Sequence, residues 1–501
     1  MSDKGRVQNK WGVLYMMSFA MFIMTIDTTM MNVSISALVR DLNTTVDGIQ
    51  LAIALYALVM AAFMIIGARI ADFWGTKKTF TMGLIIYGVG TTTATLAPNL
   101  PVLLIGWSIL EGIGGALMMP VTVTYLTKEY SGRDRAYAFG VWGGIAGAAA
   151  AFGPIIGGFF TTYITWRVGF GMEAFIVAGM IAKIGILRDY PPTRKMKFDI
   201  LGAILSATGL FLVTLSILLI NPLGDSPVMG VLSLGVLILV VFVWYERKLV
   251  REFKAPLVNM DLFKSRAFTV GNLVSIFFQI TLAGVMFTIP IFLQTVTGYN
   301  AMETGITIIP LSLMMFVFSV SGQRFLKYLS PRSIIQLGIV MAFIGLFLFM
   351  QEFSVSATGL DLAPGMLFYG VGLGLIFSQI TNLAMSGAGP SQEAEASGVF
   401  NSQKQLGMSL GTAFIGAVLI MGMINSITRM IQTKFPNVDR HMVIEWVLRI
   451  KHGEINIPPE YMPQINHLIN VALAEAMRSA MMFMMMSLVI GGVLTLWLPK
   501  R

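Results

Sequence analysis

The chain has 501 residues, of which 56% are hydrophobic and 12% are charged, with a formal net charge of +9. Soluble domains contain about 25% charged residues, so this composition excludes an ordinary soluble protein. The chain contains no cysteine, which excludes disulfides, thiolate catalysis and cysteine-based metal sites. The composition therefore indicates an integral membrane protein, whose excess basic residues face a lipid surface and not nucleic acid.

Apolar runs recur along the whole chain. Each contains about twenty residues, enough to cross roughly 30 Å of hydrocarbon as a helix, and none alternates between polar and apolar residues as outer-membrane strands do. We therefore predict an all-α membrane protein with about fourteen transmembrane helices. The first six predicted spans are 12–37, 46–66, 79–97, 101–125, 136–161 and 166–187. Two more follow at 199–220 and 228–245, and the last six are 268–294, 303–323, 333–352, 362–386, 396–424 and 477–498.

The distribution of Lys and Arg predicts the orientation of the chain. With an even number of spans both termini lie on one side, and the loops on that side hold most of the Lys and Arg, including the charged linker 246–267. Because basic loops stay on the cytoplasmic side, we expect a multi-pass protein of the plasma or inner membrane with both termini cytoplasmic. The polar segment 425–476 then becomes an extracytoplasmic loop, with a short amphipathic helix near 438–451.

An internal repeat relates the two halves of the chain. The segment that follows the second span contains Gly67, Arg69, Asp72, Gly75 and Lys77. A shift of 255 residues gives, after the tenth span, Gly322, Arg324, Lys327, Ser330 and Arg332. Two of these positions are identical and a third keeps its charge. We expect two pseudo-symmetric six-helix bundles at 12–187 and 268–498, with residues 199–245 as a two-helix insert packed outside them.

Five motifs occur in a characteristic order along the chain. They are Asp27-Thr28-Thr29 with Asn32, Ala68 to Lys78, Gly153-Pro154-Ile155-Ile156-Gly157-Gly158, Pro290 to Gln294 with Gly298-Tyr299, Gly305 and Pro310, and Asn401 with Lys404 to Gly407. Together they resemble the motifs of the fourteen-helix drug:proton antiporters of the major facilitator superfamily. The resemblance implies an exporter of small compounds that works by alternating access between its two halves.

The motif after the second span carries charges that a tight turn does not need. Asp72 can accept hydrogen bonds from the N-terminus of a neighbouring helix, where the helix dipole favours an anion. The resemblance implies a cytoplasmic gate that breaks and re-forms as the halves rock, formed by Arg69, Asp72, Gly75, Lys77 and Lys78. A basic loop that only sets the topology is the alternative interpretation.

The motif in the fifth span is rich in glycine. Gly153, Gly157 and Gly158 allow other helices to approach closely, and Pro154 is expected to bend the helix. Ordinary tight packing explains the same residues, and it is compatible with a functional role. The resemblance implies that this helix influences which conformation the exporter prefers.

Three acidic residues, Asp27, Glu111 and Glu173, fall within or near the ends of predicted spans. A charge at the bilayer centre costs about 3 kcal/mol or more, so such acids are functional candidates by default. Burial favours the neutral form of a carboxyl group, which makes reversible protonation near neutral pH feasible. We expect these acids to bind protons or a cationic substrate. The alternative is a structural ion pair with a basic residue: Arg167, Lys183 or Lys404.

The chain departs from the family pattern at three positions. Ser108 stands where the fourth helix normally carries arginine, Glu173 replaces an asparagine, and Lys404 replaces an arginine. Because this arginine is missing, the resemblance does not assign the usual proton relay to this chain. The added acids make the region more negative, which favours cationic cargo.

Other function classes fit less well. An ATP-driven pump needs a G-x-x-x-x-G-K-[ST] loop, which Gly75-Thr76-Lys77-Lys78 does not provide, and a channel would not need the gate motif. We expect no catalytic or metal-binding group of His and acidic residues within the spans, because His441, His452 and His467 all lie in one late polar segment. We therefore predict a monomeric, cofactor-free antiporter, not an enzyme, that exports small lipophilic compounds, preferentially cations. Its partners are protons, the small-molecule substrate and the bilayer. The alternative is an exporter or flippase of a lipid or lipophilic metabolite.

Overall fold

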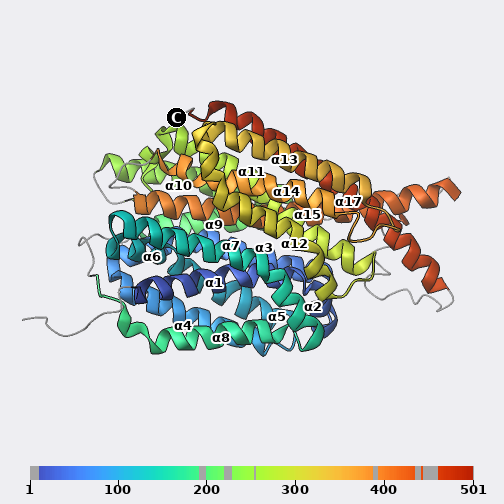
Figure 1. The fold of residues 1–501 in the computed structure, drawn as a ribbon, viewed down its shortest axis with the longest axis horizontal. Coiled ribbons are helices and arrows are strands. Elements are labelled where there is room, and N and C mark those ends of the chain that lie inside the picture. The colour runs from blue at the N-terminus through green and yellow to red at the C-terminus, as the bar shows by residue number, and fades with distance from the viewer. Residues whose placement is uncertain are drawn as a thin grey trace, which may run out of the picture.

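The computed structural model describes residues 11–190, 199–218, 228–252, 256–387, 393–434, 442–443 and 461–499. These residues form helices and connecting turns, and no strand occurs among them. Twelve of the helices are long and apolar enough to cross a membrane, and the long helices run roughly parallel to one another (Figure 1). The predicted all-α membrane class is therefore confirmed. The predicted count of fourteen spans is not, because the long helices at Thr76–Thr95 and Arg167–Ala182 are not among the twelve.

The first part of the chain follows the predicted spans closely. Its elements are α1 (Gly12–Asn32), α2 (Ile35–Asp41), α3 (Val46–Trp74), α4 (Thr76–Thr95), α5 (Leu100–Leu103), the π-helix η1 (Leu104–Glu111), α6 (Gly112–Glu129), α7 (Gly132–Tyr163), α8 (Arg167–Ala182) and the 3-10 turn η2 (Ile184–Ile186). Polar side chains cap two of these helices. Thr45 accepts a hydrogen bond from the Gly48 amide at the start of α3, and Asn99 accepts one from the Val102 amide at the start of α5.

The second part continues with the predicted insert and the later spans. Its elements are α9 (Ile200–Leu218), α10 (Val228–Arg251), η3 (Met260–Lys264), α11 (Arg266–Thr295), α12 (Ala301–Ser321), η4 (Gly322–Lys327), α13 (Pro331–Glu352), α14 (Ala363–Met385), α15 (Glu393–Lys434), α17 (Met462–Leu494) and η6 (Thr495–Trp497). Asn300 and Glu303 form a capping box that starts α12. Ser330 caps α13, whose first residue is Pro331.

The helices pack in two groups (Figure 1), and α9 and α10 form a separate pair. In the first group α1 contacts α7, α3 contacts α6, and α4 contacts both α6 and α8. In the second group α11 contacts α15 and α17, while α14 contacts α12 and α13. The groups meet where α3 packs on α15 and where α7 packs on α12. Helix α9 contacts α3, α15 and α10, so α10 lies on the outside of this pair.

Two ends of the molecule are named from α3. The motif end is the end where α3 finishes at Trp74, and the far end is the end where α3 begins at Val46. Helix α15 runs from the motif end past the far end, where it projects together with the start of α17 (Figure 1).

The predicted loop 425–476 is wrong at both of its ends. Helix α15 continues to Lys434 and α17 begins at Met462, so the first and the last residues of this segment are helical. Apolar residues spaced for a helix explain the difference, because Ile427 and Ala472 are buried against each other in a small cluster. Ser426 also donates a hydrogen bond to Glu475 at 2.7 Å. Most of the helix predicted near 438–451, including Trp446, lies outside the described residues.

One helix crossing occurs in both groups. A methyl group on Gly114 of α6 would lie 2.6 Å from the backbone nitrogen of Tyr87 in α4. A methyl group on Gly372 of α14 would lie 2.5 Å from the backbone oxygen of Gly338 in α13. Gly83, whose oxygen is 2.8 Å from the first methyl position, precedes Gly338 by 255 residues. This is the offset of the sequence repeat, so the two crossings support the expected internal symmetry.

Candidate functional site

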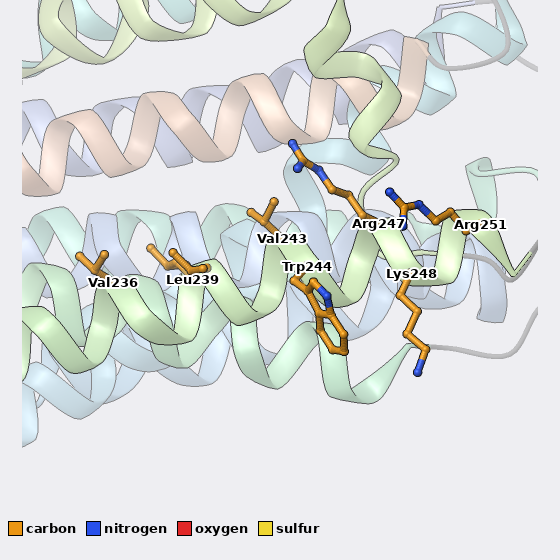
Figure 2. A pocket seen from close by; sticks show the side chains of 8 residues that line it. Val236, Leu239, Val243, Trp244, Arg247, Lys248 and Arg251 are labelled. Carbon is orange, nitrogen blue, oxygen red and sulfur yellow. The ribbon is translucent and has the colours of Figure 1, made fainter.

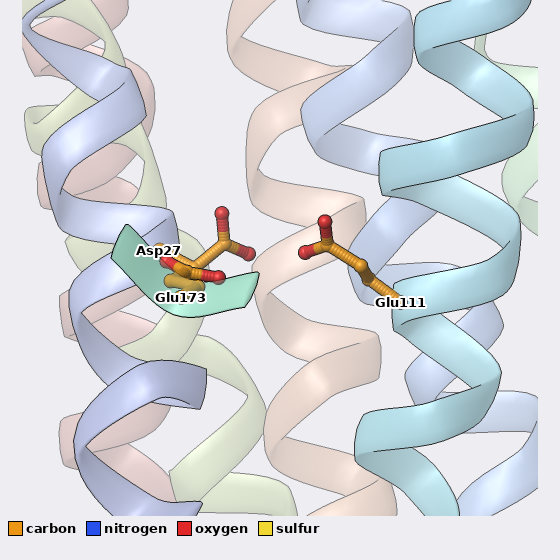
Figure 3. Close-up of side chains that lie close together, drawn as sticks. All are labelled: Asp27, Glu111 and Glu173. Atoms are coloured by element: carbon orange, nitrogen blue, oxygen red, sulfur yellow. The ribbon is translucent and has the colours of Figure 1, made fainter. Parts of the chain in front are cut away.

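The three predicted acids meet in one place. Asp27 of α1, Glu111 at the end of η1 and Glu173 of α8 are fully buried. One oxygen from each lies within 4.8 Å of the others, and the three side chains converge in Figure 3. We call these three residues the acid cluster. The expectation that the spans hold no acidic group with metal-ligand spacing is therefore wrong, because three separate helices bring the carboxyl groups together.

Aromatic residues surround the acid cluster. The Trp107 indole donates a hydrogen bond to Asp27 at 2.9 Å, and the Tyr87 hydroxyl donates one to Glu173 at 2.8 Å. Trp107 stacks on Tyr56, with ring centroids 5.9 Å apart, and meets Phe170 edge-on. Neither carboxyl oxygen of Glu111 has a hydrogen-bond partner among the described residues. The aromatic groups thus exclude bulk solvent while fixing Asp27 and Glu173 in place.

Within the described residues no Lys or Arg forms an ion pair with the acid cluster. Arg167 binds Asp41 at 3.4 Å instead. The ammonium of Lys404, on α15 in the second group, lies 5.7 Å from the Phe377 ring centroid. Two unit charges 4.8 Å apart repel by about 3.5 kcal/mol at an effective dielectric constant of about 20. Three buried carboxylates cannot all stay ionised at this separation without a cation nearby. The cluster must therefore either hold protons or bind a cation.

The π-helix η1 determines where Glu111 lies. A methyl group on Gly90 of α4 would lie 2.7 Å both from the Gly106 oxygen and from the Glu111 nitrogen. These two atoms belong to residues five positions apart, which is the separation that a π-helical hydrogen bond closes. Single π-helical turns inside α-helices occur frequently at functional sites.

The second group shows the same crossing without the π-helix. A methyl group on Gly345 of α13 would lie 2.8 Å from the Gly365 oxygen and 2.5 Å from the Tyr369 nitrogen. These residues are four positions apart, as in a regular α-helix. Helix η1 therefore accommodates one extra residue, and Glu111 occupies the place that Tyr369 has in the second group. The acid cluster belongs to the first group alone.

The motif that the resemblance assigns to a gate binds two other segments at the motif end. The Arg69 Nε donates a hydrogen bond to the Leu257 oxygen at 2.9 Å. The Arg69 guanidinium lies 3.2 Å from Glu395 and 3.8 Å from Asp72. The Asp72 side chain is 60% exposed, whereas the Glu395 side chain is 18% exposed. Glu395 also accepts a hydrogen bond from the Asn259 amide. The closer and more buried partner of Arg69 is thus Glu395, in the first turn of α15.

The other motif residues form the turn itself. Gly75 separates α3 from α4 with a φ of 94°, a conformation that favours glycine. The Lys77 ammonium donates a hydrogen bond to the Leu187 oxygen at 2.9 Å, which ties the turn to the end of the first group. Lys78 is exposed.

The glycine motif of α7 faces two neighbours near the far end. A methyl group on Gly157 would lie 2.6 Å from the Met30 oxygen of α1, and one on Gly158 would lie 2.5 Å from the Ala301 oxygen of α12. Gly153 packs against Thr29, and the Pro154 oxygen packs against Gly305 of α12. Helix α7 continues through Pro154 without a break. These residues bring backbone against backbone, both within the first group and between the groups.

Several contacts between the groups were not anticipated from the sequence. Gln50 donates a hydrogen bond to the Thr412 oxygen at 3.0 Å, and Gln294 donates one to the Val33 oxygen at 2.7 Å. Ser409 donates one to the Ala54 oxygen at 2.7 Å. The signal that could have identified these residues is the isolated polar side chain within an apolar span.

The fold defines the class as a multi-pass membrane protein, and comparison with known proteins identifies the family. The family model of the Major Facilitator Superfamily matches residues 17–412, so the chain belongs to the Major Facilitator Superfamily. Members of this family are transporters of small molecules, not enzymes. The chain is 27% identical over 416 residues to the puromycin resistance protein pur8 of Streptomyces alboniger, covering 81% of each chain. It is 29% identical over 437 residues to the multidrug transporter protein MdtP of Bacillus subtilis (strain 168), covering 84% of this chain and 77% of MdtP.

A solved structure shares the fold. A bacterial homolog of the human lysosomal transporter Spinster, in an inward-facing and unoccupied conformation, aligns with a TM-score of 0.66 at 15% sequence identity. The alignment covers 99% of this chain and 98% of that one.

Proposed function

We propose that the protein is a proton-coupled antiporter that exports small lipophilic compounds, preferentially cations, by alternating access. The acid cluster carries this proposal, because three buried carboxyl groups lie within 4.8 Å of one another. Without a basic partner in the described part of the chain, such a group retains at least one exchangeable proton. Gaining or losing that proton changes the charge inside the first group, and a change in charge can shift the balance between two conformations.

We also propose the finer topology. All fourteen long helices span the bilayer of the plasma or inner membrane, with α4 and α8 as the third and sixth spans. Residues 12–187 and 268–498 form the two moving bundles, 199–245 is the peripheral insert, and the transporter works as a monomer. The motif end is cytoplasmic, together with both termini, because Arg69, Lys77 and the linker 246–267 supply positive charge there.

The two ends of the molecule act as gates in this proposal. At the motif end Arg69 joins α3 to Glu395 of α15 and to Leu257. Near the far end Gly158 joins α7 to Ala301 of α12. Each contact joins the two groups, so each must open in turn for cargo to cross.

Proton exchange is tested in proteoliposomes that contain a pH-sensitive dye. The cargo panel is puromycin, which the relative pur8 is named for, a lipophilic cation and a neutral lipophilic compound. Asp27→Asn, Glu111→Gln, Glu173→Gln and the triple variant are compared with Glu352→Gln, an exposed acid at the end of α13. We expect the variant that lacks the coupling acid to show no proton movement when cargo is added, while it still binds the neutral compound. Binding of the cation should weaken because its charge partner is gone.

Unchanged proton movement in every single variant and in the triple variant would refute proton coupling through this cluster. Transport of the neutral compound alone, with no response to cations, would favour the alternative of an exporter of lipids or lipophilic metabolites. Normal proton movement in Glu352→Gln shows that loss of an acidic charge elsewhere is not sufficient.

A further inference from the structure

Helix α10 presents a groove on the outside of the molecule. The groove is shallow and open, has a volume of about 570 Å³ and runs along one face of α10, lined by Val236, Leu239, Val240, Val243, Trp244, Arg247, Lys248 and Arg251. Val240 is 59% exposed and Trp244 is 63% exposed. Since α10 is apolar and long enough to span a membrane, these side chains face lipid. Figure 2 shows the apolar residues along the helix and the basic residues at one end of it.

The groove changes character along its length in the way that a phospholipid does. From Val236 to Arg247 the helix rises by about 16 Å, close to half of a hydrocarbon core of roughly 30 Å. Trp244 lies at the boundary, where membrane proteins place tryptophan. Arg247 and Arg251 follow one helical turn apart and extend toward the same side of α10 in Figure 2. An acyl chain fits the apolar part, and a phosphate fits the two guanidinium groups.

In the described part of the chain, no acidic side chain occupies the two arginines. Among the described residues Arg247 and Arg251 form no ion pair and no side-chain hydrogen bond. Lys248 differs, because it lies 3.9 Å from Glu252 and 5.7 Å from the Trp244 ring centroid. The unpaired positive charge of this surface is therefore concentrated on two adjacent guanidinium groups at the level of the lipid headgroups.

We propose that this groove binds one anionic phospholipid from the leaflet at the motif end, with its phosphate between Arg247 and Arg251. Positive charge beside an apolar groove selects an anionic headgroup over a zwitterionic one. The loss of one arginine should weaken binding about fivefold, and the loss of both should weaken it about 25-fold.

The same end of α10 holds the gate. Glu246, next to Arg247, accepts a hydrogen bond from the Val258 amide at 3.0 Å. The neighbouring Leu257 oxygen accepts the hydrogen bond from Arg69 at 2.9 Å. A lipid that orders the end of α10 therefore also orders the segment to which the gate motif binds. We expect an anionic lipid to alter the transport rate as well as the stability.

Lipid selectivity is tested with the full chain in nanodiscs of phosphatidylcholine, with or without phosphatidylglycerol. Native mass spectrometry counts retained lipids, and thermal unfolding measures stabilisation. The double variant Arg247→Gln with Arg251→Gln is compared with Arg324→Gln with Lys327→Gln, which removes two exposed charges from η4 at the same end. We expect the first pair, and not the second, to abolish selective retention of phosphatidylglycerol and the stabilisation that it gives.

Brominated lipids locate the binding site. Brominated phosphatidylglycerol should quench tryptophan fluorescence more strongly than brominated phosphatidylcholine, and Trp244→Phe should remove that difference. Trp497→Phe, which removes another exposed tryptophan, should preserve it.

Three results would overturn the proposal. The first is equal retention of phosphatidylglycerol by the Arg247 and Arg251 double variant. The second is an equal loss in the η4 control, which would indicate attraction by general surface charge. The third is full stabilisation by inorganic phosphate in phosphatidylcholine alone, which would assign the arginines to a soluble anion.

Discussion

Gly158 of α7 lies against the backbone of α12, so one added methyl group tests the proposed far-end gate. That methyl would lie 2.5 Å from the Ala301 oxygen, whereas ordinary contacts begin at 3.4 Å. The two helices must then separate by about 0.9 Å. Because the obstacle is backbone and not a flexible side chain, Gly158→Ala should destabilise the conformation described here by about 1–3 kcal/mol. A population shift of roughly 5- to 150-fold toward a conformation with an open far end follows.

Gly143→Ala on the same helix is the matched control. A methyl group there meets nothing within 4 Å, so no shift is expected. The cysteine-free chain allows spin labels at Ile164 and Leu360, which are 59% and 83% exposed near the far end. Double electron–electron resonance spectroscopy should show a longer distance between the labels in Gly158→Ala and an unchanged distance in Gly143→Ala.

An unchanged distance distribution in Gly158→Ala, with normal thermal stability, would show that this contact does not close the far end. The same lengthening in both variants would assign the effect to helix propensity and not to the contact with α12.

Other perturbations test the remaining parts of the mechanism. Glu395→Gln should slow transport about tenfold, because hydrogen bonds to charged groups contribute roughly 1.5–3 kcal/mol. Asp72→Asn should slow transport less and leave cargo binding intact. Initial transport rates and binding isotherms check both variants, and a larger effect of Asp72→Asn than of Glu395→Gln would return the main role to Asp72. Deletion of Ile109 should convert η1 to a regular α-helix, which keeps the protein folded but uncouples proton movement from cargo transport. Deletion of the similarly exposed Leu367 should instead shift the register of α14 and lower the yield of folded protein. Equal yields of the two deletion variants would contradict this. Gln294→Leu should weaken far-end closure by about 1 kcal/mol, seen as a larger population of the long distance between the same spin labels.

The sequence by itself was sufficient for the class, the family and most helix positions. Hydropathy is a local property, so a run such as 268–294 predicts a span without knowledge of its neighbours, and α11 occupies Arg266–Thr295. The family resemblance was confirmed for the same reason, since its motifs are short and contiguous. Local apolarity failed at 425–476, where α15 and α17 extend through polar residues because a few apolar side chains, such as Ile427, pack across the pair.

Only the tertiary structure determined the composition of the candidate site. Asp27, Glu111 and Glu173 are separated by 84 and 62 residues, and no local pattern states that three helices will direct them to one point. The position of Glu111 depends on the extra residue of η1, which is recognised only when the crossing of α4 and α6 is compared with that of α13 and α14. The partner of Arg69 likewise comes from Glu395, more than three hundred positions away. The sequence determines the chemistry of each side chain, but the packing of the helices determines the distances at which one charge acts on another.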